Sequence, residues 1–200
     1  ERIRSPAMPL DEIEFELSAA QYAAMEYPAL RQGQPLALLL DGGLLLPDAG
    51  ALTWYTVQKE PLPPRFVRTG AAQYAFCGQI RSAVLDKADG VQRGVLLVDC
   101  GIAPVRVTCM AQDDGTLPWG TWETRYISGH LLLEGLLEDS FAAGIGEMVG
   151  VTVWHFNRLV LTPGDAHFGV YYETDSLPPQ PFVYDRLFVT ARLHRDRVSR

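Results

Sequence analysis

The chain has 200 residues, of which 48% are hydrophobic and 20% are charged. The length is enough for one domain with a hydrophobic core, and the composition excludes a largely disordered protein. A formal net charge of −7 disfavours a nucleic-acid partner, although a local basic face would still permit one. No apolar run has the length of a membrane span and the first residues do not resemble a signal peptide, so we expect a soluble, cytoplasmic protein that does not enter a membrane.

The first sixty residues predict a small strand–helix–hairpin unit. Residues 11–17 alternate glutamate with apolar side chains, which is typical of a half-buried strand with an acidic outer side. Ser18 is a favourable N-cap for a helix over residues 19–31. Asp41-Gly42-Gly43 predicts a hairpin turn. The accompanying strands are expected at residues 34–40, 44–46 and 51–57.

A proline-rich segment at residues 61–64 is expected to separate this unit, residues 1–64, from a main domain, residues 65–200. Apolar runs bounded by Gly and Pro indicate that the main domain is built from strands. Residues 125–137 fit a strand slightly better than a helix because Gly135 lowers helix propensity. A short helical turn is expected at residues 140–145. The other strands are predicted at residues 66–85 with a bulge or bend at Gly78, at 94–100 and 104–110 around a tight turn at Gly101, and at 147–161, 167–173 and 182–193.

These elements predict a mainly β (α+β) fold, an antiparallel barrel or sandwich with the small N-terminal unit packed on it. The order of five or six long, bent strands resembles a partly open barrel of the oligonucleotide/oligosaccharide-binding (OB) kind. The resemblance is one of pattern, covers about two-thirds of the chain, and by itself says little about function.

The three cysteines each lie in an apolar, strand-like run and form no Cys-x-x-Cys pair. We expect buried, reduced thiols, with one disulfide and a spare thiol as the alternative.

The last predicted strand carries the most suggestive side chains. Period-two alternation places five apolar residues on a core side: Val183, Leu187, Val189, Ala191 and Leu193. The opposite side interleaves aromatic residues with arginine: Phe182, Tyr184, Arg186, Phe188, Thr190, Arg192 and His194. Such a face is typical of single-stranded nucleic-acid platforms, and also of sugar sites and subunit interfaces. A further alternative is that the N-terminal unit covers it.

Two tryptophans, Trp119 and Trp122, lie in a Gly- and Pro-containing loop. Loop tryptophans can bind planar ligands or partners, but we favour a role in capping the open end of a barrel.

Candidate metal and catalytic groups are sparse. Asp165 and His167 could share one side of a strand, but no third ligand lies close in the sequence, so neither a metal nor a cofactor is expected. His155 sits between Trp154 and Phe156, which favours a hydrogen-bonded histidine on a partly buried strand. No nucleophile elbow and no phosphate-binding glycine loop is present, so no catalytic residue is assigned.

The sequence therefore predicts a non-enzymatic binding or assembly module. Its candidate residues are Phe182, Tyr184, Arg186, Phe188 and Arg192, with Trp119 and Trp122 as additions. The partner stays open between self-association, another protein and, against the net charge, a nucleic acid. A homo-oligomeric structural protein is the nearest alternative. The third is a small enzyme with His130, His155 or His167 beside a carboxylate in the barrel mouth.

Overall fold

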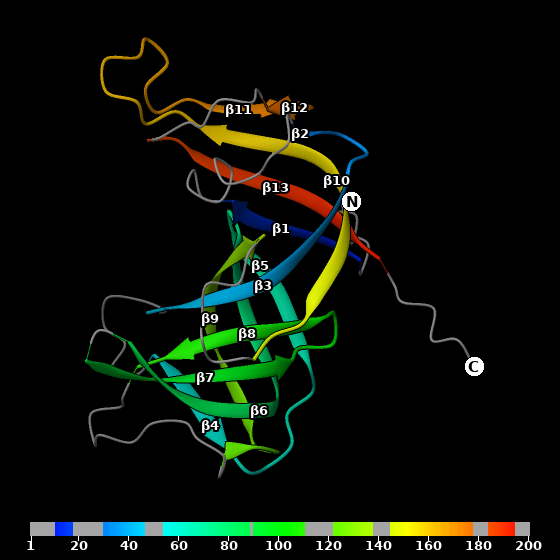
Figure 1. The fold of residues 1–200 in the computed structure, drawn as a ribbon, viewed down its shortest axis with the longest axis vertical. Coiled ribbons are helices and arrows are strands. Elements are labelled where there is room, and N and C mark those ends of the chain that lie inside the picture. Colours follow the sequence, from blue (N-terminus) through cyan, green and yellow to red (C-terminus); the bar gives the residue numbers. More distant parts are fainter. Residues whose placement is uncertain are drawn as a thin grey trace, which may run out of the picture.

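The computed structural model describes residues 11–17, 30–46, 54–88, 90–110, 122–137, 145–177 and 184–194. Their regular structure is almost entirely β (Figure 1). No helix in these ranges is long and apolar enough to cross a membrane. The strands are β1 Glu12–Leu17, β2 Leu30–Arg31, β3 Pro35–Leu45, β4 Tyr55–Gln58, β5 Arg65–Gly70, β6 Gln73–Ala88, β7 Val91–Asp99, β8 Pro104–Cys109, β9 Tyr126–Leu136, β10 Met148–Leu159, β11 Tyr171–Thr174, β12 Ser176–Leu177 and β13 Arg186–Leu193.

The strand pairings form two rings that share β3 and β9. In the first ring β3 pairs with β8, β8 with β7, β7 with β6, β6 with β9, and β9 with β3. In the second ring β3 pairs with β10, β10 with β13, β13 with β1, and β1 with β9. The first ring forms the lower half of Figure 1 and the second forms the upper half. One apolar core runs through both.

The sheet is mixed rather than antiparallel throughout. The β3–β8 pairing is parallel, and so is the β1–β9 contact, whose register consists of the single pair Glu16 and Glu134. Strands from residues 1–64 and from the later chain share this sheet, since β1 lies between β13 and β9 and β3 lies between β9 and β8. The division at residue 64 stays a prediction.

The predicted hairpin turn at Asp41-Gly42-Gly43 is wrong, because β3 continues through it as one strand. Neither glycine has a positive φ, so neither makes a turn. Gly42 instead lets β3 pack closely on β9, since a Cβ at this position would lie 2.8 Å from Leu131 Cδ2.

The single strand predicted at residues 66–85 is a hairpin of β5 and β6, and Ala72 turns the chain with φ 52°. Gly78 is not the bulge, because the register shift lies between Ile80 and Ser82. A Cβ at Gly78 would meet the Asp99 carbonyl oxygen at 2.1 Å, so this glycine permits a close approach of β6 to β7.

The strands predicted around residues 94–100, 104–110, 125–137 and 147–161 are confirmed as β7, β8, β9 and β10. At residues 167–173 only the end is strand, as β11. The helix predicted over residues 19–31 is wrong at its end, because Leu30 and Arg31 form β2. The rest of that helix, residues 19–29, lies outside the described residues. So do residues 140–144 of the predicted helical turn. The last strand starts at Arg186, later than predicted.

Candidate functional site

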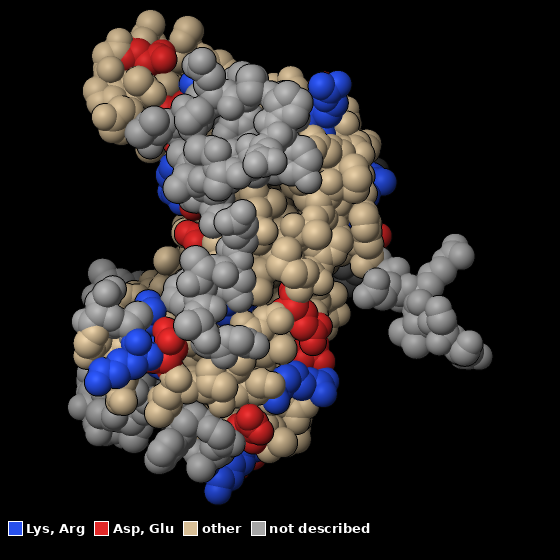
Figure 2. Space-filling model, viewed as in Figure 1, with Lys and Arg blue, Asp and Glu red and all other residues tan. Residues whose placement is uncertain are grey.

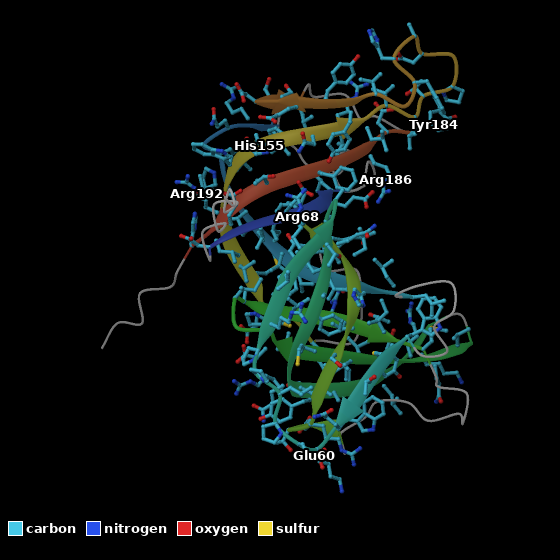
Figure 3. All side chains as sticks on the ribbon, turned by 180° about the vertical axis from the view of Figure 1, so that it is seen from behind. Glu60, Arg68, His155, Tyr184, Arg186 and Arg192 are labelled. Atoms are coloured by element: carbon cyan, nitrogen blue, oxygen red, sulfur yellow. The ribbon has the colours of Figure 1, made fainter. Side chains whose placement is uncertain are left out.

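The candidate surface is the side of β1, β13, β10 and β11 that points away from the core, which we call the outer face. The register places Glu14 beside Thr190 and Glu16 beside Phe188. Side chains at directly opposed positions of neighbouring strands share one face of a sheet. In Figure 3 the labelled Arg192 and His155 lie toward one end of this face, Arg186 and Tyr184 lie toward the other, and Arg68 lies between them.

One end of the outer face joins an arginine to aromatic rings. Arg186 donates two hydrogen bonds to the Glu16 carboxylate, at 2.9 and 2.7 Å. Its guanidinium carbon lies 5.0 Å from the centroid of the Phe188 ring, which in turn lies 6.0 Å from the Tyr171 ring. The hydrogen bonds to the Glu16 carboxylate raise the pKa of Arg186, which therefore keeps its positive charge.

The other end repeats this combination with different residues. The Arg192 guanidinium carbon lies 4.5 Å from the centroid of the Trp154 ring, and the Trp154 side chain is 43% exposed. Guanidinium–indole stacking of this kind leaves the ring and the cation available to a partner. Both ends of the face therefore offer an accessible arginine with an aromatic neighbour.

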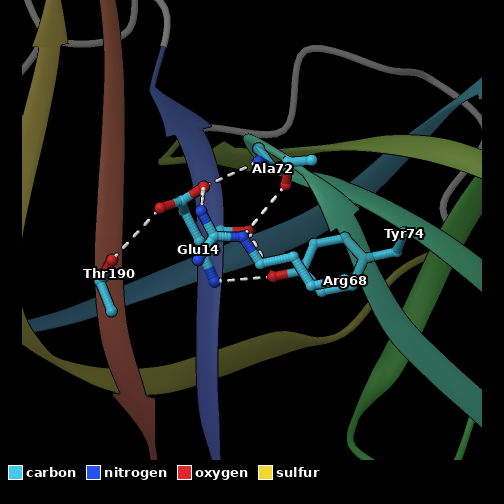
Figure 4. Close-up of polar contacts among 6 residues, drawn as sticks. Glu14, Arg68, Ala72, Tyr74 and Thr190 are labelled. Carbon is cyan, nitrogen blue, oxygen red and sulfur yellow. Dashed lines mark hydrogen bonds and ion pairs between the residues drawn. The ribbon is translucent and has the colours of Figure 1, made fainter. Parts of the chain in front are cut away.

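Between the two ends, the buried Glu14 ties the β5–β6 hairpin to the outer face (Figure 4). Its carboxylate lies 2.8 Å from Arg68 Nη2 and accepts hydrogen bonds from the Ala72 N–H at 2.8 Å and the Thr190 hydroxyl at 3.5 Å. The Tyr74 hydroxyl accepts a bond from the Glu14 N–H and donates one to the Glu14 carbonyl, each at 2.8 Å. The register of β1 with β9 consists of the pair at Glu16 alone, so β9 does not pair with Glu14. The Tyr74 hydroxyl takes its place as the hydrogen-bond partner of the Glu14 N–H and carbonyl groups. Burial raises the pKa of Tyr74 to about 12, so it stays a phenol.

A row of charged residues crosses the middle of the sheet. Glu16, Glu134, Asp41 and Arg106 occupy successive partner positions on β1, β9, β3 and β8. Burial, Asp41 and Glu16 raise the pKa of the Glu134 carboxyl, against the influence of Arg186. Arg106 donates to Asp41 at 2.8 Å. In the part of the chain that the structure describes, no three His, Cys, Asp or Glu residues are placed to hold a metal ion.

The structure separates the sequence-predicted candidates into three groups. Tyr184 is 60% exposed, Arg192 is exposed and Arg186 is half-exposed, so these three are accessible. Phe188 is only 1% exposed and Trp122 only 8%, and Trp122 packs edge-on against Tyr55. Phe182 and Trp119 lie outside the described residues.

Sequence reasoning missed Trp154, Tyr171 and Arg68. They reach the outer face from β10, β11 and the β5–β6 hairpin, and only the register shows which strands flank β13. A β-bulge between Val153 and His155 shifts the alternation of β10, so period-two counting could not have placed Trp154 with certainty.

Two hollows are formed by described residues, one beside the Arg192 end of the outer face and one on the first ring. One, of about 510 Å³, lies between the β7–β8 turn, the start of β10 and the end of β13, and it is lined by Asp11, Glu147 and His194 among others. The second, of about 420 Å³, lies over β4, β9, β6 and β5, and His130 lines it without a neighbouring carboxylate among its lining residues. Asp165 and His167 lie on an exposed turn, with 3.5 Å between Oδ1 and Nδ1. A histidine–carboxylate catalytic site stays a prediction.

The three cysteines are free and buried, as expected. Burial raises the pKa of the Cys100 and Cys109 thiols to about 12, and it also raises that of Cys77. Thiols in this state are poor nucleophiles at neutral pH.

Comparison with family models, with curated proteins and with solved structures finds no match to this chain. The function is therefore argued from the geometry alone.

Proposed function

We propose that the protein is a non-enzymatic assembly module whose outer face packs against the outer face of a second copy of the chain. The observation that carries this proposal is the pair of exposed aromatic–arginine groups at the two ends of the face, Trp154 with Arg192 and Tyr171 with Arg186. Tyrosine, tryptophan and arginine are the residues most enriched at the centres of protein interfaces.

The charge of the outer face supports a protein partner over a polyphosphate. Arg68 is matched by Glu14 and Arg186 by Glu16, and Arg192 lies opposite Glu12 in the register. A face on which each arginine is matched by a glutamate has no excess positive charge to bind phosphates. Figure 2 shows the opposite side of the molecule, where in the lower half Lys and Arg also lie beside Asp and Glu.

The layout of the face suits a two-fold contact. Arg186 and Arg192 are six residues apart on β13, a separation of about 20 Å at the usual strand rise. A two-fold axis through the middle of β13 would bring the Trp154 end of one copy onto the Tyr184 end of the other. Interfaces of this self-complementary type are the commonest in homo-oligomers.

Two finer structural expectations belong to the same proposal. The first ring, with its β6–β7–β8 meander and five strands, supports an OB-like barrel. The buried free thiols support a reducing, cytoplasmic location.

The test is the solution mass of the protein measured by light scattering over a range of concentrations. We expect the 22.1 kDa chain to approach twice this mass as concentration rises. A Trp154→Ala, Tyr184→Ala double variant should need about tenfold higher concentration to associate, which corresponds to about 1.4 kcal/mol. A Trp54→Ala, Leu85→Ala variant removes two other exposed apolar side chains and should behave like the parent.

A monomer at every concentration, or association that the double variant leaves unchanged, would refute the proposal. Salt-sensitive binding of a mixed-sequence single-stranded oligonucleotide that is lost in Arg186→Ala would refute it too, and would show that the face binds nucleic acid instead.

A further inference from the structure

The hollow over β4, β9, β6 and β5, which we call the β4–β5 groove, lies on the outside of the first ring and has no role in the assembly proposed above. Its central row is read from the register: Thr56 pairs with Ser128, Ser128 with Cys77, and Cys77 with Arg65. These four side chains therefore share one face of the sheet, from β4 across to β5. The row spans three strand spacings, about 14 Å. Strands β4 and β9 lie in the lower half of Figure 3.

Small side chains form the floor of the groove. Ala75 and Cys77 on β6 are buried and lie on the same side of the sheet as the central row. The walls come from the two outer strands, with Trp54 and Thr56 on one side and Arg65 and Thr69 on the other. A volume of about 420 Å³ lies within the range of small-molecule sites.

The polar side chains of the groove can all donate hydrogen bonds. Arg65, His130, Ser128, Thr56 and Thr69 line it, and no Asp or Glu is among its eleven lining residues. The chain as a whole carries 24 acidic residues against 17 Lys and Arg, so this lining departs from the average surface. None of the ion pairs between described residues involves Arg65. A guanidinium without a carboxylate beside it, next to hydroxyl groups, favours an anionic ligand with several acceptor oxygens.

Trp54 adds a surface for a ring. Its indole is 54% exposed on the wall of the groove, where the small side chains of the floor leave room for a flat group. Stacking of a nucleobase on an aromatic side chain contributes about 1–3 kcal/mol.

We propose that the β4–β5 groove binds a nucleoside phosphate, with the base against Trp54 and the phosphate at Arg65, and with the hydroxyl groups of Ser128 and Thr56 facing the ribose. The same chemistry is presented by a free nucleotide and by one nucleotide of a single strand. Because none of the described residues that line it is a carboxylate, the groove is accessible to a phosphate despite the net charge of the chain.

The experiment is isothermal titration calorimetry at low ionic strength with adenosine monophosphate, adenosine, inorganic phosphate and a five-nucleotide single-stranded DNA. We expect adenosine monophosphate to bind saturably, and adenosine and phosphate to bind at least about tenfold more weakly. Arg65→Ala and Trp54→Ala should each weaken binding by about tenfold or more. Arg81→Ala and Phe168→Ala remove an exposed arginine and an exposed aromatic ring outside the groove and should leave the Kd unchanged.

Equal affinities for the mononucleotide and the oligonucleotide would assign the groove to free nucleotides. A tighter oligonucleotide that still requires Arg65 and Trp54 would assign it to single strands. The proposal is overturned if adenosine monophosphate does not bind, if adenosine alone binds as tightly, or if Arg81→Ala weakens binding as much as Arg65→Ala. All four variants change exposed side chains, so unchanged far-ultraviolet spectra and melting temperatures are expected and show that the fold is intact.

Discussion

Replacing Tyr74 by phenylalanine tests how the two rings of strands are held together. The substitution removes one hydroxyl and keeps the aromatic ring, which stacks on Phe66 with 4.1 Å between centroids. Packing is therefore preserved. The Glu14 N–H and carbonyl groups, both bonded to this hydroxyl, lose their partner in a buried place.

The expected cost follows from these two groups. An unsatisfied buried hydrogen-bonding group costs about 1–3 kcal/mol, so two of them should lower the free energy of unfolding by about 2–6 kcal/mol. With a urea m-value of about 3 kcal/mol per molar, the midpoint of unfolding should fall by about 0.7–2 M.

Urea unfolding followed by circular dichroism measures this shift, and amide hydrogen exchange locates it. Exchange of the Glu14 amide should accelerate in Tyr74→Phe more than that of amides in β7 and β8. Tyr184→Phe is the matched control, because this exposed tyrosine should change stability by no more than about 0.5 kcal/mol. If the Tyr74→Phe midpoint lies within about 0.2 M of the parent at the same m-value, the Tyr74 hydroxyl does not stabilise β1.

Three further predictions concern packing, protonation and reactivity. Gly78→Ala should destabilise the fold by about 3 kcal/mol or more, because its Cβ would meet a backbone oxygen at 2.1 Å. Gly43→Ala is the control, since its Cβ would have its nearest contact at 3.9 Å. Equal melting temperatures of the two variants would contradict the close approach at Gly78. Glu134→Gln should stabilise the protein at pH 7, since the raised pKa of Glu134 penalises its charged form in the folded state; this gain should vanish in chemical unfolding below pH 4, where the carboxyl is protonated in both states. Cys100 and Cys109 should not react with a thiol reagent at pH 8 until denaturant is added, and rapid native labelling of both would contradict their burial.

Strands β7 and β8 could be predicted from the sequence because their apolar runs and the Gly101 turn are local signals. The same signals misled at Gly42 and Gly78, where the glycine is required by a neighbouring strand rather than by a turn. The sequence alone does not distinguish a glycine that makes a turn or bulge from one that lets a neighbouring strand approach closely. The difference lies in the distance to an atom far away in the sequence.

The sequence by itself determined that the chain is mostly β, that its cysteines are buried, and that β1 carries glutamates on one side and core residues on the other. Only the tertiary structure decided which exposed groups meet. Period-two alternation placed Phe188 and Arg192 on one face, but Phe188 is buried with Tyr171 and Arg186 against its ring, while Trp154 joins Arg192 from another strand. Alternation assigns a side chain to a face of its own strand, whereas strand order and register determine what lies across from it, and these depend on contacts between residues far apart in the chain.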